Sequence, residues 1–240
     1  MQVSALIFAG GSGKRMTLTS KPKQFLEYKN KPIIIYTLEL FEQNDNVDNI
    51  VVVCIKDWID YLKELLVKFN ITKVVKIVPG GETGQGSIFN GLKEVYTLSP
   101  NPKEDIVLIH DGVRPLINQD IINDNIFTTK DFGDAITVSP AIETIINTND
   151  DNVVTNIIDR SKCMLARAPQ TFRVNDIYSS HLKANKENRQ DFIDSATMMR
   201  YYGYDLKTVM GPAENIKITT PSDFYVFKAW VEDCEGEEDE

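Results

Sequence analysis

Cysteine is scarce in this chain of 240 residues, with copies only at Cys54, Cys163 and Cys234. None stands in a Cys-x-x-Cys pair or beside a histidine at metal-ligand spacing, so nothing favours a cysteine metal site or a disulfide framework. A sparse, odd set of cysteines suits a reducing compartment. No apolar run approaches the roughly 18 residues of a membrane span, and the N-terminus lacks the basic segment and apolar core of a signal peptide. We therefore expect a soluble, cytoplasmic protein.

Basic residues are also in deficit. Lys and Arg number 26 against 35 Asp and Glu, which gives a net charge of -9 and argues against a nucleic-acid binder with a broad basic surface. Seven of the acids lie in residues 232–240, and the rest of the chain is close to neutral. We expect this tail to be solvated and frayed. The whole chain has the 42% apolar and 25% charged composition of a globular protein with a sizeable core.

Short apolar runs alternate along the chain with segments of helical periodicity. The expected strands are rich in Val, Ile and Leu and cover residues 3–8, 50–55, 74–78, 106–109 and 135–138. The expected helices begin at Pro32 or cover residues 58–69, 88–95, 187–203 and 221–231. This alternation predicts βαβ units with right-handed crossovers, and hence an α/β fold with a mostly parallel sheet.

The middle of the chain has a different pattern. Residues 143–146 and 153–158 are rich in β-formers, and a polar loop over 147–152 joins them. This predicts a hairpin. We expect a single domain over 1–231, from which a β-arm at about 141–161 projects.

A glycine-rich loop, residues 10–13, follows the first expected strand. Basic residues follow it at Lys14, Arg15, Lys21 and Lys23. The loop is not a Walker A motif, because Phe8 stands where that pattern has glycine and Arg15 where it has Ser or Thr. Taken alone, the segment fits either a triphosphate site, where glycine lets backbone N–H groups approach phosphate, or a tight turn with surface lysines.

Polar residues also end the fourth expected strand, at His110-Asp111 and Arg114. Asp111 and Arg114 lie where ligands bind an open parallel sheet, so they fit a metal–phosphate and substrate site or a simple turn-fixing pair. We interpret His110 as a hydrogen-bonded structural residue and His181 as a surface residue. Lys217 precedes a helix and is either an anion-binding cation or an ordinary strand lysine.

The sequence shows no Cys/His or Ser/His/Asp set, which argues against acyl transfer. It has no redox motif either. Several cations, one carboxylate and no obvious nucleophile favour phosphoryl-type chemistry, which depends on positioning and charge stabilisation.

In their order along the chain, the segments GGSGKRM, PKQF, HDGVRP, APQTF and NIKITTPSD resemble the cytidylyltransferases that activate polyol phosphates. The relatives are the methylerythritol phosphate and the ribitol-5-phosphate cytidylyltransferases. The resemblance covers almost the whole chain outside the acidic tail. It implies a Rossmann-like nucleotidyltransferase fold, a homodimer formed through the β-arm, and transfer of CMP from CTP to a polyol phosphate with Mg²⁺, releasing pyrophosphate.

The resemblance also implies roles for individual residues by motif position. The catalytic residues that contact the triphosphate and the transition state would be Arg15, Lys23 and Lys217. The nucleotide would be bound by Ala9, Gly10, Gly11, Gly81, Glu82, Ser87 and Gly112. The acceptor would be bound by Asp111, Arg114, Thr144 and Arg160, with Thr144 and Arg160 reaching the sister subunit. The metal ligand would be Asp111.

Three positions depart from the family pattern. Gly84 stands where arginine is common, Ala168 where threonine is common, and Glu214 where the methylerythritol enzymes tend to have aspartate. These departures favour D-ribitol 5-phosphate, a teichoic acid or capsule precursor, over 2-C-methyl-D-erythritol 4-phosphate, an isoprenoid precursor. Two other hypotheses remain: a glycosyltransferase on the same fold, although the chain has no Asp-x-Asp pair, and a non-catalytic nucleotide-binding regulator.

Overall fold

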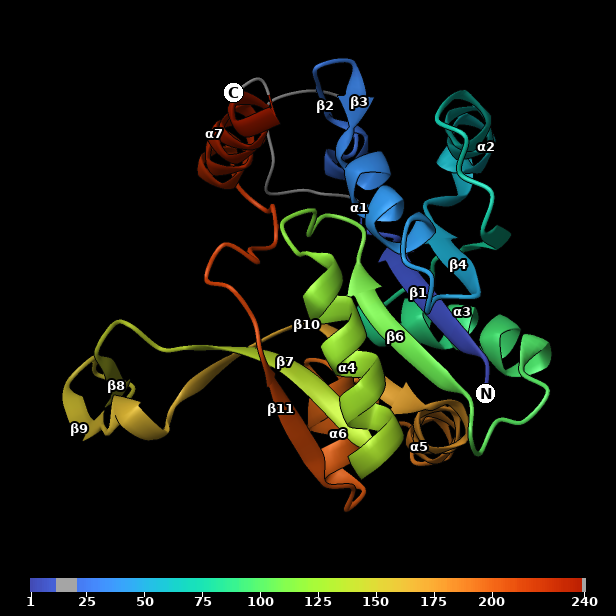
Figure 1. The fold of residues 1–240 in the computed structure, drawn as a ribbon. Coiled ribbons are helices and arrows are strands. Elements are labelled where there is room, and N and C mark those ends of the chain that lie inside the picture. Colours follow the sequence, from blue (N-terminus) through green and yellow to red (C-terminus); the bar gives the residue numbers. More distant parts are fainter. Residues whose placement is uncertain (12–20, 239–240) are drawn as a thin grey trace.

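The computed structural model describes residues 1–11 and 21–238, with side chains as far as residue 233. Its main sheet has the strand order β11-β7-β10-β6-β1-β4-β5. These strands are β1 (Val3–Ala9), β4 (Asn49–Cys54), β5 (Val74–Pro79), β6 (Ile106–Asp111), β7 (Asp134–Pro140), β10 (Met164–Arg173) and β11 (Leu206–Met210). All neighbouring pairs are parallel except those of β10, which runs antiparallel to β6 and β7. The predicted α/β fold with a mostly parallel sheet is confirmed (Figure 1).

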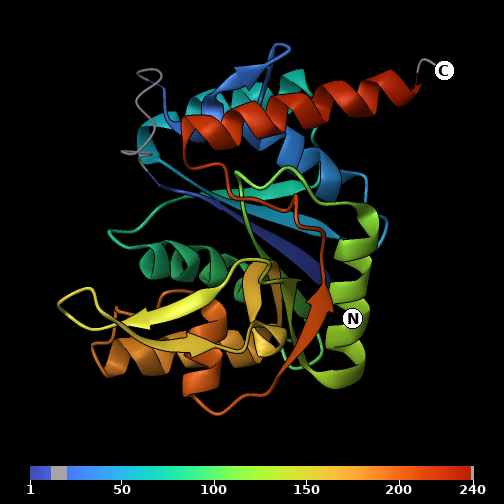
Figure 2. The same ribbon diagram turned by 90° about the vertical axis from the view of Figure 1, so that its left-hand side faces the viewer.

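Helices cover both faces of this sheet (Figure 2). They are α1 (Ile33–Glu42), α2 (Ile59–Lys68), α3 (Gly84–Leu98), α4 (Gln119–Phe132), α5 (Val174–Lys186) and α6 (Ser195–Tyr201). Ala5 and Ile7 of β1 pack with α1, α2 and α4, whereas Leu6 between them packs with α3, α5 and α6. Because successive side chains of a strand point to opposite faces, a strand covered on both sides is apolar along most of its length, as β1 and β4 are.

The prediction of a helix over residues 187–203 is wrong for the first half of that range. Helix α6 begins at Ser195, because the Asp194 carboxylate caps its first turn by accepting a hydrogen bond of 2.8 Å from the Thr197 backbone N–H. The helix before it, α5, ends at Lys186. The sequence reading did not predict β10, β11, α4 or α5.

The predicted hairpin is confirmed. Strands β8 (Ile145–Thr148) and β9 (Val154–Ile158) pair antiparallel. The Asn149 side chain fixes the connecting turn by accepting hydrogen bonds from the backbone N–H groups of Asp151 and Val153. Figure 1 shows this arm projecting away from the sheet and its helices.

Helix α7 (Pro221–Glu238) continues past the predicted end at residue 231. The Asp223 carboxylate fixes its start by accepting backbone N–H bonds from Thr219 and Thr220 at 2.8 and 2.7 Å. The helix packs beside the two-stranded ribbon of β2 (Glu27–Tyr28) and β3 (Lys31–Pro32) through Phe227. In the part of the chain that the structure describes, no helix is both long and apolar enough to span a membrane.

Asp134 at the start of β7 is a buried carboxyl group whose ionisation should cost stability. Its side chain is 4% exposed and accepts a hydrogen bond from the Arg173 backbone N–H. Burial raises the pKa of Asp134 to about 7. The native state therefore holds a proton between the ordinary carboxyl pKa and 7 that the unfolded state has lost, so stability falls as pH rises through this range.

We expect Asp134→Asn, which cannot ionise, to raise Tm by about 2 °C or more at pH 8, with a smaller gain at pH 5. Thermal melts of this variant and of the exposed control Asp131→Asn at both pH values test the expectation. A gain that is larger at pH 5 than at pH 8 would contradict it.

Candidate active site

The carboxyl ends of β1, β5 and β6 meet at one edge of the sheet. The backbone of Gly10 after β1 lies against that of Gly80 after β5: a Cβ atom on either glycine would sit 3.3 Å from the other's Cα. The hydroxyl of Ser87 holds the next loop by accepting a hydrogen bond of 3.0 Å from the Gly81 N–H. After β6, the Gly112 N–H donates to the Phe8 carbonyl at 3.1 Å. The loops predicted to bind nucleotide are therefore neighbours.

The structure brings together most of the predicted nucleotide residues at this edge. Gly10, Gly11, Gly81 and Gly112 belong to these loops, Ala9 ends β1, and Ser87 lies in the first turn of α3. Glu82 follows Gly81 and is exposed to solvent. Arg15, predicted as a catalytic cation, lies outside the described residues.

The segment around Lys23 is tied to the first loop by a residue that the sequence reading overlooked. Gln24, in the short 3₁₀ turn Lys23–Phe25, is buried, and its side-chain amide donates to the Ala9 carbonyl at 2.6 Å. The Lys23 Nζ donates to the Ile218 carbonyl at 3.1 Å. Lys23 is thus placed beside the segment that carries Lys217.

Asp111 forms ion pairs with two cations. Its Oδ2 accepts from the Arg114 Nε at 2.7 Å, and its Oδ1 pairs with the Lys217 Nζ at 2.5 Å. Burial opposes ionisation of Asp111, whose side chain is 7% exposed. The charges of Lys217 and Arg114 outweigh that effect and lower the pKa of the carboxyl below its ordinary value. The site therefore holds a carboxylate between two cations at neutral pH.

Backbone contacts explain how Lys217, remote in sequence, reaches Asp111. The Ile218 N–H donates to the Val113 carbonyl at 2.9 Å, and the Arg114 guanidinium donates to the Asn215 carbonyl at 2.9 Å. These bonds hold residues 215–218 across the loop after β6. Lys217 keeps 39% of its side chain exposed, so it can face an anion as well as Asp111.

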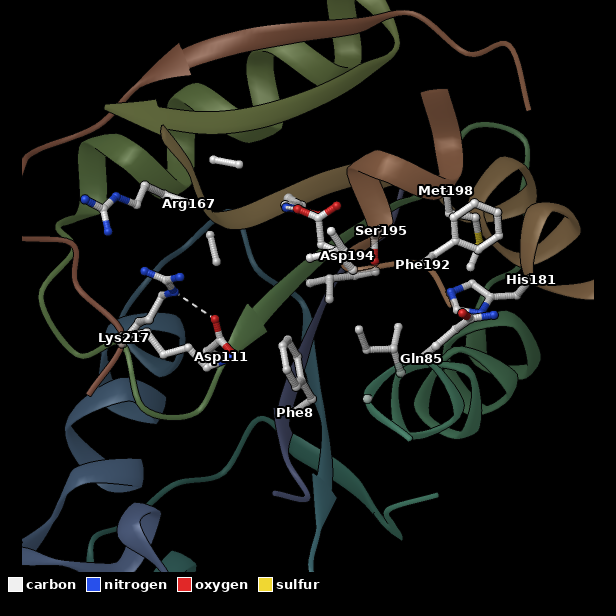
Figure 3. Close-up of a pocket in the computed structure, with 18 residues that line it drawn as sticks. Phe8, Gln85, Asp111, Arg167, His181, Phe192, Asp194, Ser195, Met198 and Lys217 are labelled. Carbon is white, nitrogen blue, oxygen red and sulfur yellow. Dashed lines mark hydrogen bonds and ion pairs between the residues drawn. The ribbon is translucent and has the colours of Figure 1, made fainter. Parts of the chain in front are cut away.

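A cavity of about 320 Å³ opens beside this ion cluster. Its charged end carries Asp111 and Lys217, together with Arg167, a cation that the sequence reading did not select (Figure 3). Arg114 also lines it. The opposite end is formed by Gln85, His181, Phe192 and Met198, with Phe8 between the two ends (Figure 3). A cavity with cations at one end and neutral polar and apolar groups at the other suits a ligand that is anionic at one end only.

The structure confirms the prediction for one histidine and contradicts the prediction for the other. His110 is fully buried and its Nε2 donates to the Arg114 carbonyl at 3.0 Å, which confirms a structural, hydrogen-bonded role. His181 is 1% exposed on α5, so its interpretation as a surface residue is wrong. Burial lowers the pKa of each histidine to about 4, which makes both weak bases at neutral pH.

The two acceptor residues predicted on the arm do not join the cavity. Arg160 donates to the Ile142 carbonyl at 2.6 Å on the arm itself, and Thr144 lies just before β8. Neither is among the described residues that line the cavity. Figure 1 shows the arm pointing away from the body that carries Asp111 and Lys217.

A metal site made of protein ligands alone is not evident. The described residues contain no group of three or more His, Cys, Asp or Glu side chains that could hold a metal ion. Asp111 can offer a carboxylate oxygen at the edge of the cavity. This fits Mg²⁺, which often binds through one or two carboxylates plus substrate phosphates.

Comparison with known proteins gives a consistent result. The family model described as "IspD: 2-C-methyl-D-erythritol 4-phosphate cytidylyltransferase" matches residues 3–233. Over 97% of both chains, the sequence is 54% identical to a ribitol-5-phosphate cytidylyltransferase of Vibrio parahaemolyticus. A protein of the same name from Streptococcus agalactiae serotype Ia is 48% identical, again over 97% of both chains.

A 2-C-methyl-D-erythritol 4-phosphate cytidylyltransferase of Clostridium botulinum is 39% identical over 92% of this chain and 93% of its own. Among solved structures, the 4-diphosphocytidyl-2C-methyl-D-erythritol synthase of Anaerococcus prevotii superposes with a TM-score of 0.81 at 27% identity, covering 96% of each chain.

Proposed function

The chain belongs to the 2-C-methyl-D-erythritol 4-phosphate cytidylyltransferase family and is a nucleotidyltransferase, and from this premise we propose that it transfers CMP from CTP to D-ribitol 5-phosphate. The products would be CDP-ribitol and pyrophosphate. The observation that supports the chemistry is the buried Asp111 carboxylate between Lys217 and Arg114, beside glycine loops that suit a nucleotide. The observation that supports the acceptor is the higher identity to the ribitol-5-phosphate enzymes, 54% and 48% against 39%.

In the proposed reaction, an oxygen of the acceptor phosphate attacks the α-phosphorus of CTP in line, and the bond to the β-phosphate breaks to release pyrophosphate. Both reactants are anions, so their repulsion is a major part of the barrier. Lys23, Lys217 and Arg114 would offset it and stabilise charge in the transition state. A phosphate monoester is largely ionised at neutral pH, so no strong base is needed. This agrees with the low pKa values, about 4, of His110 and His181.

We further propose that Mg²⁺ accompanies CTP and takes one ligand from Asp111, with the others from phosphate and water. When bound, it would neutralise phosphate charge in the transition state. In the absence of substrate, Asp111 orients Lys217 and Arg114 toward the cavity.

A homodimer formed through the β-arm is part of the proposal. The arm exposes apolar side chains that a partner subunit would cover, since clusters of this kind mark interaction surfaces. They include Ile142, Ile146, Val153, Val154 and Ile157, each between 47% and 71% exposed. In such a dimer Thr144 and Arg160 would reach the partner's acceptor site, which explains why they lie far from their own.

Arg160→Ala should raise the KM for the acceptor by about 10-fold or more, because a charge-assisted contact to the acceptor phosphate is lost. The KM for CTP should stay within about twofold, since the arm contacts the acceptor only. Steady-state kinetics test this, with Lys162→Ala as the matched control on the same exposed turn. A collapse of CTP affinity in Arg160→Ala would refute the placement of the arm.

Subunit mixing tests the shared site directly. At an acceptor concentration well below KM, where Arg160→Ala is itself about 10-fold less active, Arg160→Ala subunits mixed with Lys217→Met subunits should regain about a quarter of the wild-type activity, because half of the dimers are mixed and each has one complete site. No recovery in a mixture that does exchange subunits would mean that each site uses its own arm.

The acceptor is tested by following pyrophosphate release with CTP, Mg²⁺ and a panel of D-ribitol 5-phosphate, 2-C-methyl-D-erythritol 4-phosphate and glycerol 3-phosphate. We expect kcat/KM for D-ribitol 5-phosphate to exceed that for the methylerythritol compound by about 10-fold or more. The reverse preference would assign the isoprenoid precursor as acceptor. CTP binding without pyrophosphate release from any acceptor would refute the proposed function.

A further inference from the structure

The end of the cavity remote from the ion cluster contains polar atoms without partners. Among the described residues, both ring nitrogens of His181 and the Oε1 of Gln85 are buried and make no hydrogen bond. Buried polar groups are normally paired, because an unpaired one loses its water contacts without compensation. His181 and Gln85 both line the cavity, and Figure 3 shows them at the end remote from Asp111 and Lys217, called the inner end below.

Packing holds these two side chains in place. One face of the His181 ring stacks on Phe89, with 5.5 Å between ring centroids and planes 8° apart. The ring lines the cavity and its two buried nitrogens have no partner among the described residues, so a ligand can supply one. The Gln85 amide nitrogen donates to the Arg189 carbonyl at 2.8 Å, so its Oε1 remains as an acceptor. The inner end is therefore an ordered hydrogen-bonding surface.

The inner end is also electrically neutral. Burial lowers the pKa of His181 to about 4, so at neutral pH its imidazole has one nitrogen that donates and one that accepts. Asp194, a carboxylate that also lines the cavity, lies nearer its middle (Figure 3), and its oxygens accept hydrogen bonds from the Thr197 N–H and the Gln170 amide. A hydroxyl group, which both donates and accepts, matches this surface better than a phosphate does.

The cations that line the cavity lie at its other end, where Lys217 and Arg167 appear beside Asp111 in Figure 3. Between the ends, Phe8 offers apolar surface to carbon-bound hydrogens (Figure 3). The volume of about 320 Å³ falls in the range of small-molecule pockets, about 300–1,000 Å³. The cavity thus offers cations at one end, an apolar wall in the middle and neutral polar groups at the other end. A polyol phosphate has its phosphate, its carbon chain and its terminal hydroxyl in the same order.

We propose that His181 and Gln85 bind the hydroxyl groups at the end of the acceptor that is remote from its phosphate, and so select the length of the polyol chain. This inference rests on the proposed function, because it deepens the acceptor specificity of the same site. A five-carbon polyol phosphate reaches the inner end with its last hydroxymethyl group. An acceptor one carbon shorter leaves His181 and Gln85 unpaired.

His181→Phe keeps the ring and its stacking on Phe89 but removes both nitrogens, and Gln85→Met removes Oε1 together with the amide donor to the Arg189 carbonyl. Each should lower kcat/KM for D-ribitol 5-phosphate by about 10-fold. The value for D-erythritol 4-phosphate should change by less than about twofold, and the KM for CTP should be unchanged. The control Ser180→Ala removes another buried polar group of α5, one that bonds the Asp176 carbonyl and does not line the cavity.

An equal loss with both acceptors, or no loss with either, would overturn the chain-length role. Thermal melts identify a variant that fails to fold. If one of the two variants does not fold, the kinetics of the other test the proposal. If the wild-type protein releases no pyrophosphate with any acceptor, the proposed function fails separately. Calorimetric titration of the two polyol phosphates then still decides the inference: a chain-length preference lost in His181→Phe supports it, and equal wild-type affinities refute it.

Discussion

Lys217→Met should reduce kcat by about 10²–10³-fold, the usual effect of losing one charge that stabilises a transition state. The Lys217 ammonium is partly exposed at the charged end of the cavity and bonded to Asp111 at 2.5 Å. Its charge can therefore act on the phosphates of both reactants. Folding should be little affected, because Asp111 keeps its second partner, Arg114, at 2.7 Å. We expect Tm to fall by no more than about 4 °C.

Pyrophosphate release and thermal melts measured on the same preparation separate the two effects. The control Lys186→Met removes an exposed lysine at the end of α5, remote from the lining of the cavity. It should retain wild-type turnover. Turnover of Lys217→Met within about threefold of the wild type would remove Lys217 from the mechanism.

Asp111→Asn should also lower kcat by about 10²-fold or more, for a different reason. The substitution keeps the shape of the side chain but removes the charge that orients Lys217 and Arg114 and that we propose for Mg²⁺. Raising the Mg²⁺ concentration should restore part of the activity if the carboxylate is a metal ligand. The exposed control Asp205→Asn, which loses only a surface ion pair with Arg200, should remain active.

The same variant makes a prediction about pH. The native pKa of Asp111 lies below its ordinary value, so its ion pairs stabilise the fold above the ordinary carboxyl pKa, and that stability is lost as pH falls through the native value. The Tm difference between wild type and Asp111→Asn should therefore be largest near pH 7 and shrink under acid conditions. A difference that grows on acidification would show that the Asp111 pairs do not stabilise the native state.

The elements that could be predicted from the sequence are those in which buried positions are occupied by apolar residues. Strands β1, β4 and β6 are continuous apolar runs because helices cover them on both faces. Strand β10 was not predicted because its buried stretch, residues 168–172, includes the polar Gln170 and Thr171. Thr171 bonds to Asn125, and Gln170 bonds to Asp194 and to the Ala196 N–H. Such partners come from distant segments, so no local pattern identifies them.

The same limit applies to the prediction of the site residues from the sequence. Asp111 and Arg114 were predicted from their charge and their place after the fourth expected strand, and Lys23 and Lys217 from their charge and the family resemblance. Arg167, Gln24 and Gln85 were missed, because their importance depends on contacts made only in the folded chain. His181 could have been found: Val174, Ile177, His181 and Ala184 recur at helical spacing and are all buried on α5. The polar neighbours of His181 concealed that periodicity.

The central claim is that cations at one edge of the sheet let the acceptor phosphate attack the α-phosphorus of CTP. It is tested most directly by supplying D-ribitol 5-phosphate with ¹⁸O in its phosphate oxygens and analysing the products by mass spectrometry and ³¹P nuclear magnetic resonance. We predict CDP-ribitol that keeps all of the label, including the oxygen that bridges the two phosphorus atoms, and pyrophosphate that carries none. Labelled pyrophosphate, or CMP formed without a CDP-polyol, would contradict the account.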